Sequence, residues 1–102
     1  MPRHKEIDIE DSISNINRVL TQIKELITLV DDKAYIERLN NFYDRMEYTN
    51  PTKDTGIARL DRRISDSLGD LKIQLTTHQA RSVVNNKTET ISQLINERLA
   101  KA

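Results

Sequence analysis

Few residues of this chain have the types and spacing that catalysis or metal binding requires. The only imidazoles are His4 and His78, and His78 has no Asp or Glu three or four residues away. A metal site or an acid–base dyad on either histidine would therefore need groups from distant parts of the chain. We expect His4 to lie in a basic arm and His78, one turn beyond Leu75, to be a partly buried structural residue.

Two acidic motifs also have a chemical interpretation. Asp31-Asp32 could form a carboxylate pair, but no histidine or glycine-rich loop accompanies it. Asp54-Thr55-Gly56 is the tripeptide of aspartic proteases, which hold it on a loop between β-strands, where two carboxylates share a proton. Here it lies between a proline turn and a helical pattern. We therefore interpret Asp32, and either Asp54 or Thr55, as helix caps.

The remaining catalytic signatures are missing from the sequence. It contains no cysteine, and we find neither a glycine-rich phosphate loop nor a serine elbow motif. We expect no enzyme activity, catalytic residue, cofactor, metal or small-molecule substrate. The start of the chain lacks the apolar stretch of a signal peptide, and no segment is long enough to cross a membrane. We therefore expect a cytoplasmic protein.

The composition predicts an all-α fold. The chain has 102 residues with only two glycines and two prolines, too few for the turns of a sandwich, barrel or doubly wound sheet. Hydrophobic residues make up 36% and charged residues 31%. Such a small, polar chain can build only a modest core, which favours self-association. We predict a bundle of three to four helices with coiled-coil-like packing that forms a homo-oligomer.

Apolar spacing locates the helices. The first has a continuous seam with alternating steps of four and three, which comprises Ile9, Ile13, Ile16, Leu20, Ile23, Ile27 and Val30. The phase changes at Asp31-Asp32, which indicates either a break or one helix over residues 9–47 with a stutter. A third helix follows from Ile57 to Leu75, and a fourth is centred on Ile91, Leu94, Ile95 and Leu99, with Asn86 as its cap.

Charge divides the chain at residues 49–55, the one clear loop. We predict a single helical domain with a flexible basic arm (1–7), an acidic helical half (8–48) and a basic helical half (56–102). Residues 1–54 carry eight Lys/Arg and eleven Asp/Glu, whereas residues 55–102 carry eight and five. The net charges are therefore −3 and +3. This asymmetry favours an acidic hairpin packed on a basic one, within a chain or between chains.

All four aromatic residues lie between residues 35 and 48. One stripe of this helix, from Ile36 to Met46, is sufficient to dock it. A second stripe beside it combines aromatic and arginine side chains, the mixture enriched at interface hot spots. This stripe comprises Tyr35, Arg38, Phe42 and Arg45. It predicts either a protein interface or a broad core edge with arginines extending over it.

The densest basic stretch begins at Arg59. Its candidate nucleic-acid contacts are Arg59, Arg62, Arg63 and Arg81. Phosphates would attract such a row, but aspartates are interleaved, and Arg62 and Asp66 have the spacing of an ion pair on one helix face. The row therefore predicts a salt-bridged solvent face, a contact with the acidic half, or a nucleic-acid surface.

These patterns favour a non-enzymatic protein–protein interaction module. We expect a small self-associating assembly, adaptor or inhibitory protein of a bacterium, phage or mobile element, which binds itself and another protein. The alternative is a nucleic-acid-binding accessory protein that uses the basic half.

Overall fold

The computed structural model describes residues 7–101, and this part of the chain is all-helical without strands. Its four helices are α1 (Ile9–Leu29), α2 (Lys33–Glu47), α3 (Thr55–Thr76) and α4 (Arg81–Lys101). The predicted all-α bundle is therefore confirmed, with four helices. The region from residue 9 to residue 47 forms two helices. Residues 1–6 of the predicted arm, including His4, lie outside the described residues.

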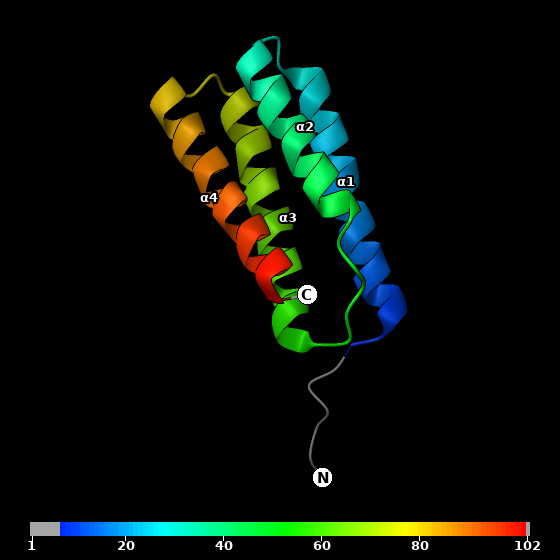
Figure 1. Cartoon of the computed structure of the whole chain (residues 1–102). Coiled ribbons are helices and arrows are strands. Elements are labelled where there is room, and N and C mark those ends of the chain that lie inside the picture. Colours follow the sequence, from blue (N-terminus) through cyan, green and yellow to red (C-terminus); the bar gives the residue numbers. More distant parts are fainter. Residues whose placement is uncertain (1–6, 102) are drawn as a thin grey trace.

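The four helices form two antiparallel hairpins that pack side by side (Figure 1). α1 contacts α2 and α3, and α4 contacts α3 and α2, so α2 and α3 lie on opposite corners of the bundle. We call the end where α1 and α3 begin the lower end, as in Figure 1, and the end with the two hairpin turns the upper end.

Aspartate caps start α2 and α3, as the sequence predicts. The side chain of Asp32 accepts a hydrogen bond from the Ala34 N–H at 2.8 Å, while Val30 before it is extended. Asp54 Oδ1 accepts from the Ile57 N–H at 2.9 Å. Each carboxylate satisfies an N–H group that the first helical turn leaves without a partner. The tripeptide at Asp54 is therefore a helix cap.

The turn between α3 and α4 corrects two predictions. His78 is exposed and has a φ of 57°, in the left-handed region, so it is not a partly buried residue. The N–H of Gln79 donates to the Gln74 carbonyl at 3.0 Å and that of His78 to the Leu75 carbonyl at 3.4 Å, which together form a Schellman ending. α4 then begins at Arg81, five residues before the predicted cap at Asn86.

The buried core lies between all four helices. In α1 the buried seam is rotated relative to the predicted one. It consists of Ile16, Val19, Ile23 and Leu26, and the buried Val30 follows directly after the helix. Because α1 packs against both α2 and α3, the line that faces both neighbours becomes the centre of its buried side. Ile9 and Ile13 from the predicted seam are instead 39% and 42% exposed.

α2 has 15 residues, whereas the other helices have 21 or 22. A segment of residues 48–54 therefore continues down to the lower end where α2 is too short (Figure 1). The N–H of Thr52 donates to Ser12 Oγ at 2.8 Å, and the N–H of Ile7 donates to the Lys53 carbonyl at 3.0 Å. These bonds fix the segment along the first turn of α1.

Two ion pairs join the acidic and basic halves within the chain. Lys72 Nζ lies 3.1 Å from Glu25 Oε1, and Arg81 Nη2 lies 2.9 Å from Asp32 Oδ2. The Ala34 N–H, followed by Arg81, lowers the pKa of the Asp32 carboxyl. Both pairs are substantially exposed, so they contribute to register more than to stability.

Candidate functional site

The predicted interface stripe on α2 faces α4 of the same chain. Phe42 is 1% exposed and belongs to the core. The interpretation of Phe42 as a free contact residue is therefore wrong, because the side of α2 that is not used against α1 packs against α4. The broad core edge that the sequence also allowed is what the structure contains.

The polar members of this stripe bind α4 through hydrogen bonds. The Tyr35 hydroxyl donates to Asn85 Oδ1 at 3.1 Å, and Arg38 Nη1 donates to Thr88 Oγ1 at 2.8 Å. Arg45 donates to the side chain of Asn96. These bonds pair residues that differ by 50 or 51 in number, so α2 and α4 run in parallel with a fixed register. Each of these side chains thus donates at least one hydrogen bond inside the chain.

A hollow of about 490 Å³ remains between α2 and α4. Its lining consists of Ala34, Glu37, Arg38, Asn41, Phe42, Glu89 and Ser92. Apart from Ala34 and Phe42, every lining residue is polar or charged, and the lining combines two carboxylates with one guanidinium. The arrangement does not converge on a single ligand chemistry, and we assign no function to it.

The four candidate nucleic-acid contacts do not form one surface. Arg59, Arg62 and Arg63 are exposed near the start of α3, at the lower end. Arg81 starts α4 at the upper end, where it pairs with Asp32 and lies 5.1 Å from the centre of the Tyr35 ring. The structure therefore brings three of the arginines together and separates the fourth.

The predicted pairing of Arg62 with Asp66 is not formed. The ion pairs found within residues 7–101 involve neither these two residues nor Arg59 and Arg63. The first turns of α3 therefore carry a cluster of exposed guanidinium groups that form no ion pair with any residue of the described part of the chain.

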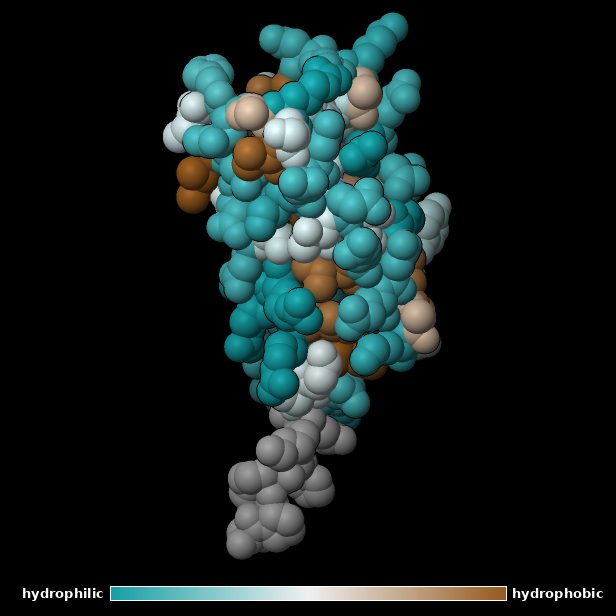
Figure 2. Space-filling model, turned by 90° about the vertical axis from the view of Figure 1, so that its left-hand side faces the viewer, coloured by the Kyte–Doolittle hydropathy of each residue, from teal (hydrophilic) through white to brown (hydrophobic). Residues whose placement is uncertain are grey.

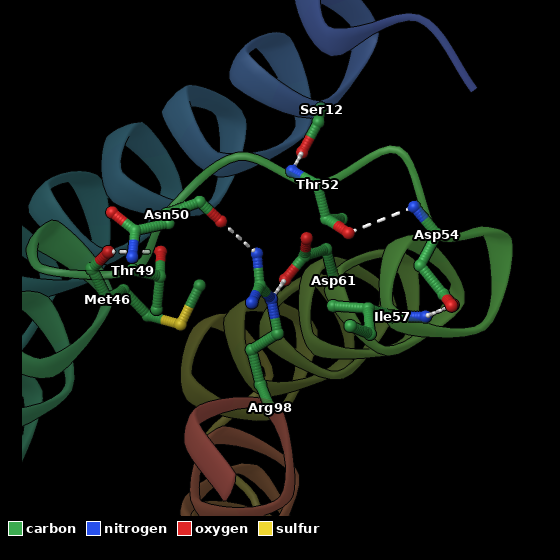
Figure 3. A network of polar contacts seen from close by, with 9 residues as sticks. All are labelled: Ser12, Met46, Thr49, Asn50, Thr52, Asp54, Ile57, Asp61 and Arg98. Carbon is green, nitrogen blue, oxygen red and sulfur yellow. Dashed lines mark hydrogen bonds and ion pairs between the residues drawn. The ribbon is translucent and has the colours of Figure 1, made fainter. Parts of the chain in front are cut away.

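A buried ion pair at the lower end was missed by the sequence analysis. Arg98 of α4 and Asp61 of α3 both have fully buried side chains, and Arg98 Nε donates to Asp61 Oδ1 at 2.8 Å. Arg98 Nη2 also donates to the carbonyl of Asn50 at 2.7 Å. Figure 3 shows the guanidinium between these two acceptors. Arg98 thus connects both helices of the second hairpin to the segment that continues from α2.

The spacing of this pair contains a signal that could have revealed it. Asp61 lies three residues before Ile64, and Arg98 three residues after Ile95, so each occupies a core position of its helix. Burial raises the pKa of the Asp61 carboxyl, and the hydrogen bond and charge of Arg98 act in the opposite direction. Because Asp61 Oδ2 and Arg98 Nη1 are buried without a hydrogen-bond partner among the described residues, the pair is only half satisfied.

Four exposed apolar side chains around the end of α2 were also missed. Tyr48, the last residue of the α2 turn, is 80% exposed. The register of α2 and α4 places it level with Leu99, and the bond between Thr52 and Ser12 brings the following segment onto α1 beside Ile13. We call this surface the apolar band, and its residues are Ile9, Ile13, Tyr48 and Leu99.

The apolar band is exposed because α2 ends early. A longer α2 would cover the adjacent sides of α1 and α4, but the segment of residues 48–54 carries mainly polar side chains there. Sequence reasoning assigned Ile9 and Ile13 to the core because their spacing matches the seam of α1. The length of the neighbouring helix, which decides their exposure, is not encoded in that spacing.

Within residues 7–101, the structure contains no group of three or more His, Asp or Glu that could hold a metal ion. In the same part of the chain, no helix has the length and apolar character needed to cross a membrane. No protein-family model, curated protein or solved structure matches the chain.

Proposed function

We propose that this chain is a non-enzymatic protein-interaction module that associates with a second copy of itself through the apolar band. The observation that carries the proposal is the position of exposed apolar side chains. Residues 7–101 contain seven large apolar side chains that are exposed, and four of them form the apolar band. The other three are Leu29, Ile73 and Val83.

The chemistry of the band supports a contact with protein. Clustered exposed apolar side chains mark interaction surfaces, whereas isolated ones are ordinary. Tyrosine is enriched at interface hot spots, and Tyr48 has most of its surface exposed. On the face seen in Figure 2, hydrophilic side chains predominate and apolar ones reach the surface in small patches.

A second copy is the occupant we favour. The core of a 102-residue chain with 36% hydrophobic residues is small, so covering four apolar side chains would add substantially to its stability. A twofold contact needs only one surface that is complementary to itself, and an apolar surface can meet that requirement. An adaptor or assembly role would follow if another protein replaced the second copy.

The experiment is multi-angle light scattering and sedimentation velocity across a concentration series. We expect the wild-type chain to form dimers, and the double variant Ile13→Ser, Tyr48→Ser to remain monomeric. Loss of one hot-spot side chain weakens association by about 2 kcal/mol, which is about 30-fold in Kd. Circular dichroism should show unchanged helix content, since both side chains are exposed.

The matched control is Ile73→Ser, which removes a 61% exposed apolar side chain from the outer side of α3, away from the band. It should dimerise like the wild type. A wild-type chain that is monomeric at every concentration would contradict the proposal. So would an Ile73→Ser variant that loses association as strongly as the double variant.

A further inference from the structure

The three arginines near the start of α3 have a neighbour on α1. Gln22 of α1 and Ser65 of α3 exchange hydrogen bonds of 2.7 and 3.0 Å, which fixes the parallel register of the two helices. Arg18 precedes Gln22 by four residues, and Arg62 precedes Ser65 by three. These offsets place both arginines at the same level of the bundle, about one turn below this contact. Both side chains are exposed.

α4 supplies a further cation on the other side of α3. A hollow of about 250 Å³ lies between α3 and α4 at the lower end. Its lining consists of Gly56, Arg59, Leu60, Arg63, Glu97 and Lys101. It therefore contains three cationic side chains against one carboxylate. Five exposed cations thus lie on α3 and on the neighbouring parts of α1 and α4. We call them the basic band, and they are Arg18, Arg59, Arg62, Arg63 and Lys101.

We propose that the basic band binds the sugar-phosphate backbone of a nucleic acid. Four of its five cations are arginines, whose planar guanidinium groups can bind phosphate oxygens through two parallel hydrogen bonds. None of the five takes part in the ion pairs found within residues 7–101. They are thus available to replace the counterions of a phosphate chain, which is the source of sequence-independent affinity.

The distribution of acidic residues supports this assignment despite the zero net charge of the chain. α2 carries the exposed carboxylates Glu37, Asp44 and Glu47, and it occupies the corner opposite α3. A phosphate chain that approaches α3 is therefore far from these carboxylates, and the field of the molecule orients it. Exposed carboxylates lie near these cations along the chain, among them Asp54, Asp66 and Glu97, and they weaken the attraction.

This surface differs from the one predicted by the sequence. It excludes Arg81, which is paired with Asp32 at the upper end, and it includes Arg18 and Lys101. It is also separate from the apolar band, so nucleic-acid binding does not depend on the proposed self-association. A chain with both surfaces would connect a protein partner to a nucleic acid.

The test is fluorescence anisotropy of labelled single-stranded and duplex DNA with the full chain over a range of salt concentrations. Five phosphate contacts give a slope of about −3.5 for log affinity against log salt on a single strand. The affinity should therefore fall about 100-fold for a fourfold increase in salt. For the double variant Arg59→Gln, Arg63→Gln, three contacts remain, and the same increase in salt should reduce affinity only about 20-fold.

Two further variants make the test specific. Glu97→Gln removes the carboxylate from the hollow and should strengthen binding. Lys33→Gln removes one positive charge from an exposed residue of α2, as each single substitution in the basic band does, and it should leave the affinity unchanged. All substituted side chains are exposed, so circular dichroism should show an intact bundle.

Absence of DNA binding at low salt would overturn the proposal. It would also be overturned if Lys33→Gln weakened binding as much as a substitution in the basic band, or if polyglutamate competed as well as DNA of equal charge. The double variant Ile13→Ser, Tyr48→Ser should bind DNA like the wild type. Failure of the basic band and failure of the apolar band are therefore separate results.

Discussion

Replacing Arg98 by methionine tests how the lower end of the bundle is held together. Methionine retains much of the unbranched apolar length but removes the guanidinium that binds Asp61 and the Asn50 carbonyl. The fully buried carboxylate then loses its counter-charge. Breaking a buried ion pair from one side costs about 3–5 kcal/mol, a large part of the 5–15 kcal/mol that holds a typical domain.

The measurement is urea and thermal unfolding followed by circular dichroism. At about 4–8 °C per kcal/mol for a small domain, Arg98→Met should lower the melting temperature by at least about 12 °C. The double variant Asp61→Leu, Arg98→Met removes both charges and should be more stable than Arg98→Met. The double variant should not reach the stability of the wild type, since the Asn50 carbonyl still lacks the donor that Arg98 provides.

The pH dependence gives an independent check. Burial raises the pKa of Asp61, so the protonated carboxyl is favoured in the folded state, and its contribution to stability is lost as pH rises through that pKa. Without Arg98 the pKa rises further. The deficit of Arg98→Met relative to the wild type should therefore shrink as the pH falls to about 4, near the ordinary pKa of aspartate.

Two outcomes would refute this reasoning. A loss below about 1 kcal/mol in Arg98→Met would mean that the pair is not buried and coupled as described. Strict additivity, in which the double variant loses the sum of the two single losses, would mean that Asp61 and Arg98 act independently.

Two further predictions concern backbone positions. Gly69→Ala should stabilise the bundle by about 1 kcal/mol, as measured by urea unfolding. Glycine is unfavourable inside a helix, and an added Cβ at this position would meet no atom within 4 Å. A destabilised variant would contradict this, because it would reveal a contact at the outer side of α3. His78→Gly should also raise the stability, by about 1 kcal/mol, because glycine adopts the φ of 57° without the steric cost that a side chain has there. His78→Val should lower the stability. Equal stabilities of the glycine and valine variants would contradict the left-handed conformation of residue 78.

Much of the fold follows from local patterns in the sequence. The spacing of apolar residues predicts helical segments. The change of phase at Asp31-Asp32 allows either the end of a helix or a stutter within one longer helix, and the structure contains the helix end. The caps at Asp32 and Asp54 were predictable because each aspartate directly precedes a helical pattern. The start of α4 was placed too late, because its first turn contains only one buried apolar residue, Val84, in a mostly polar helix.

The surfaces were less predictable because they depend on the lengths and neighbours of helices. Phe42 has the residue type of a hot spot, but its exposure depends on whether α4 covers that side of α2. Ile13 has the spacing of a core residue, but α2 ends before reaching it. The Asp61–Arg98 pair joins residues 37 apart, which periodicity places on core sides without indicating that they meet. These properties arise from tertiary packing.

The most direct test of the proposed interaction surface uses the absence of cysteine from the natural sequence. Single-cysteine variants Glu47→Cys, next to Tyr48, and Gln79→Cys, in the upper turn, can each carry one spin label on an exposed residue. Pulsed electron paramagnetic resonance then measures the distance between labels in different copies. Association through the apolar band predicts a shorter distance at residue 47 than at residue 79. A shorter distance at residue 79, or no dipolar coupling at residue 47 in samples that light scattering shows to be dimeric, would contradict it.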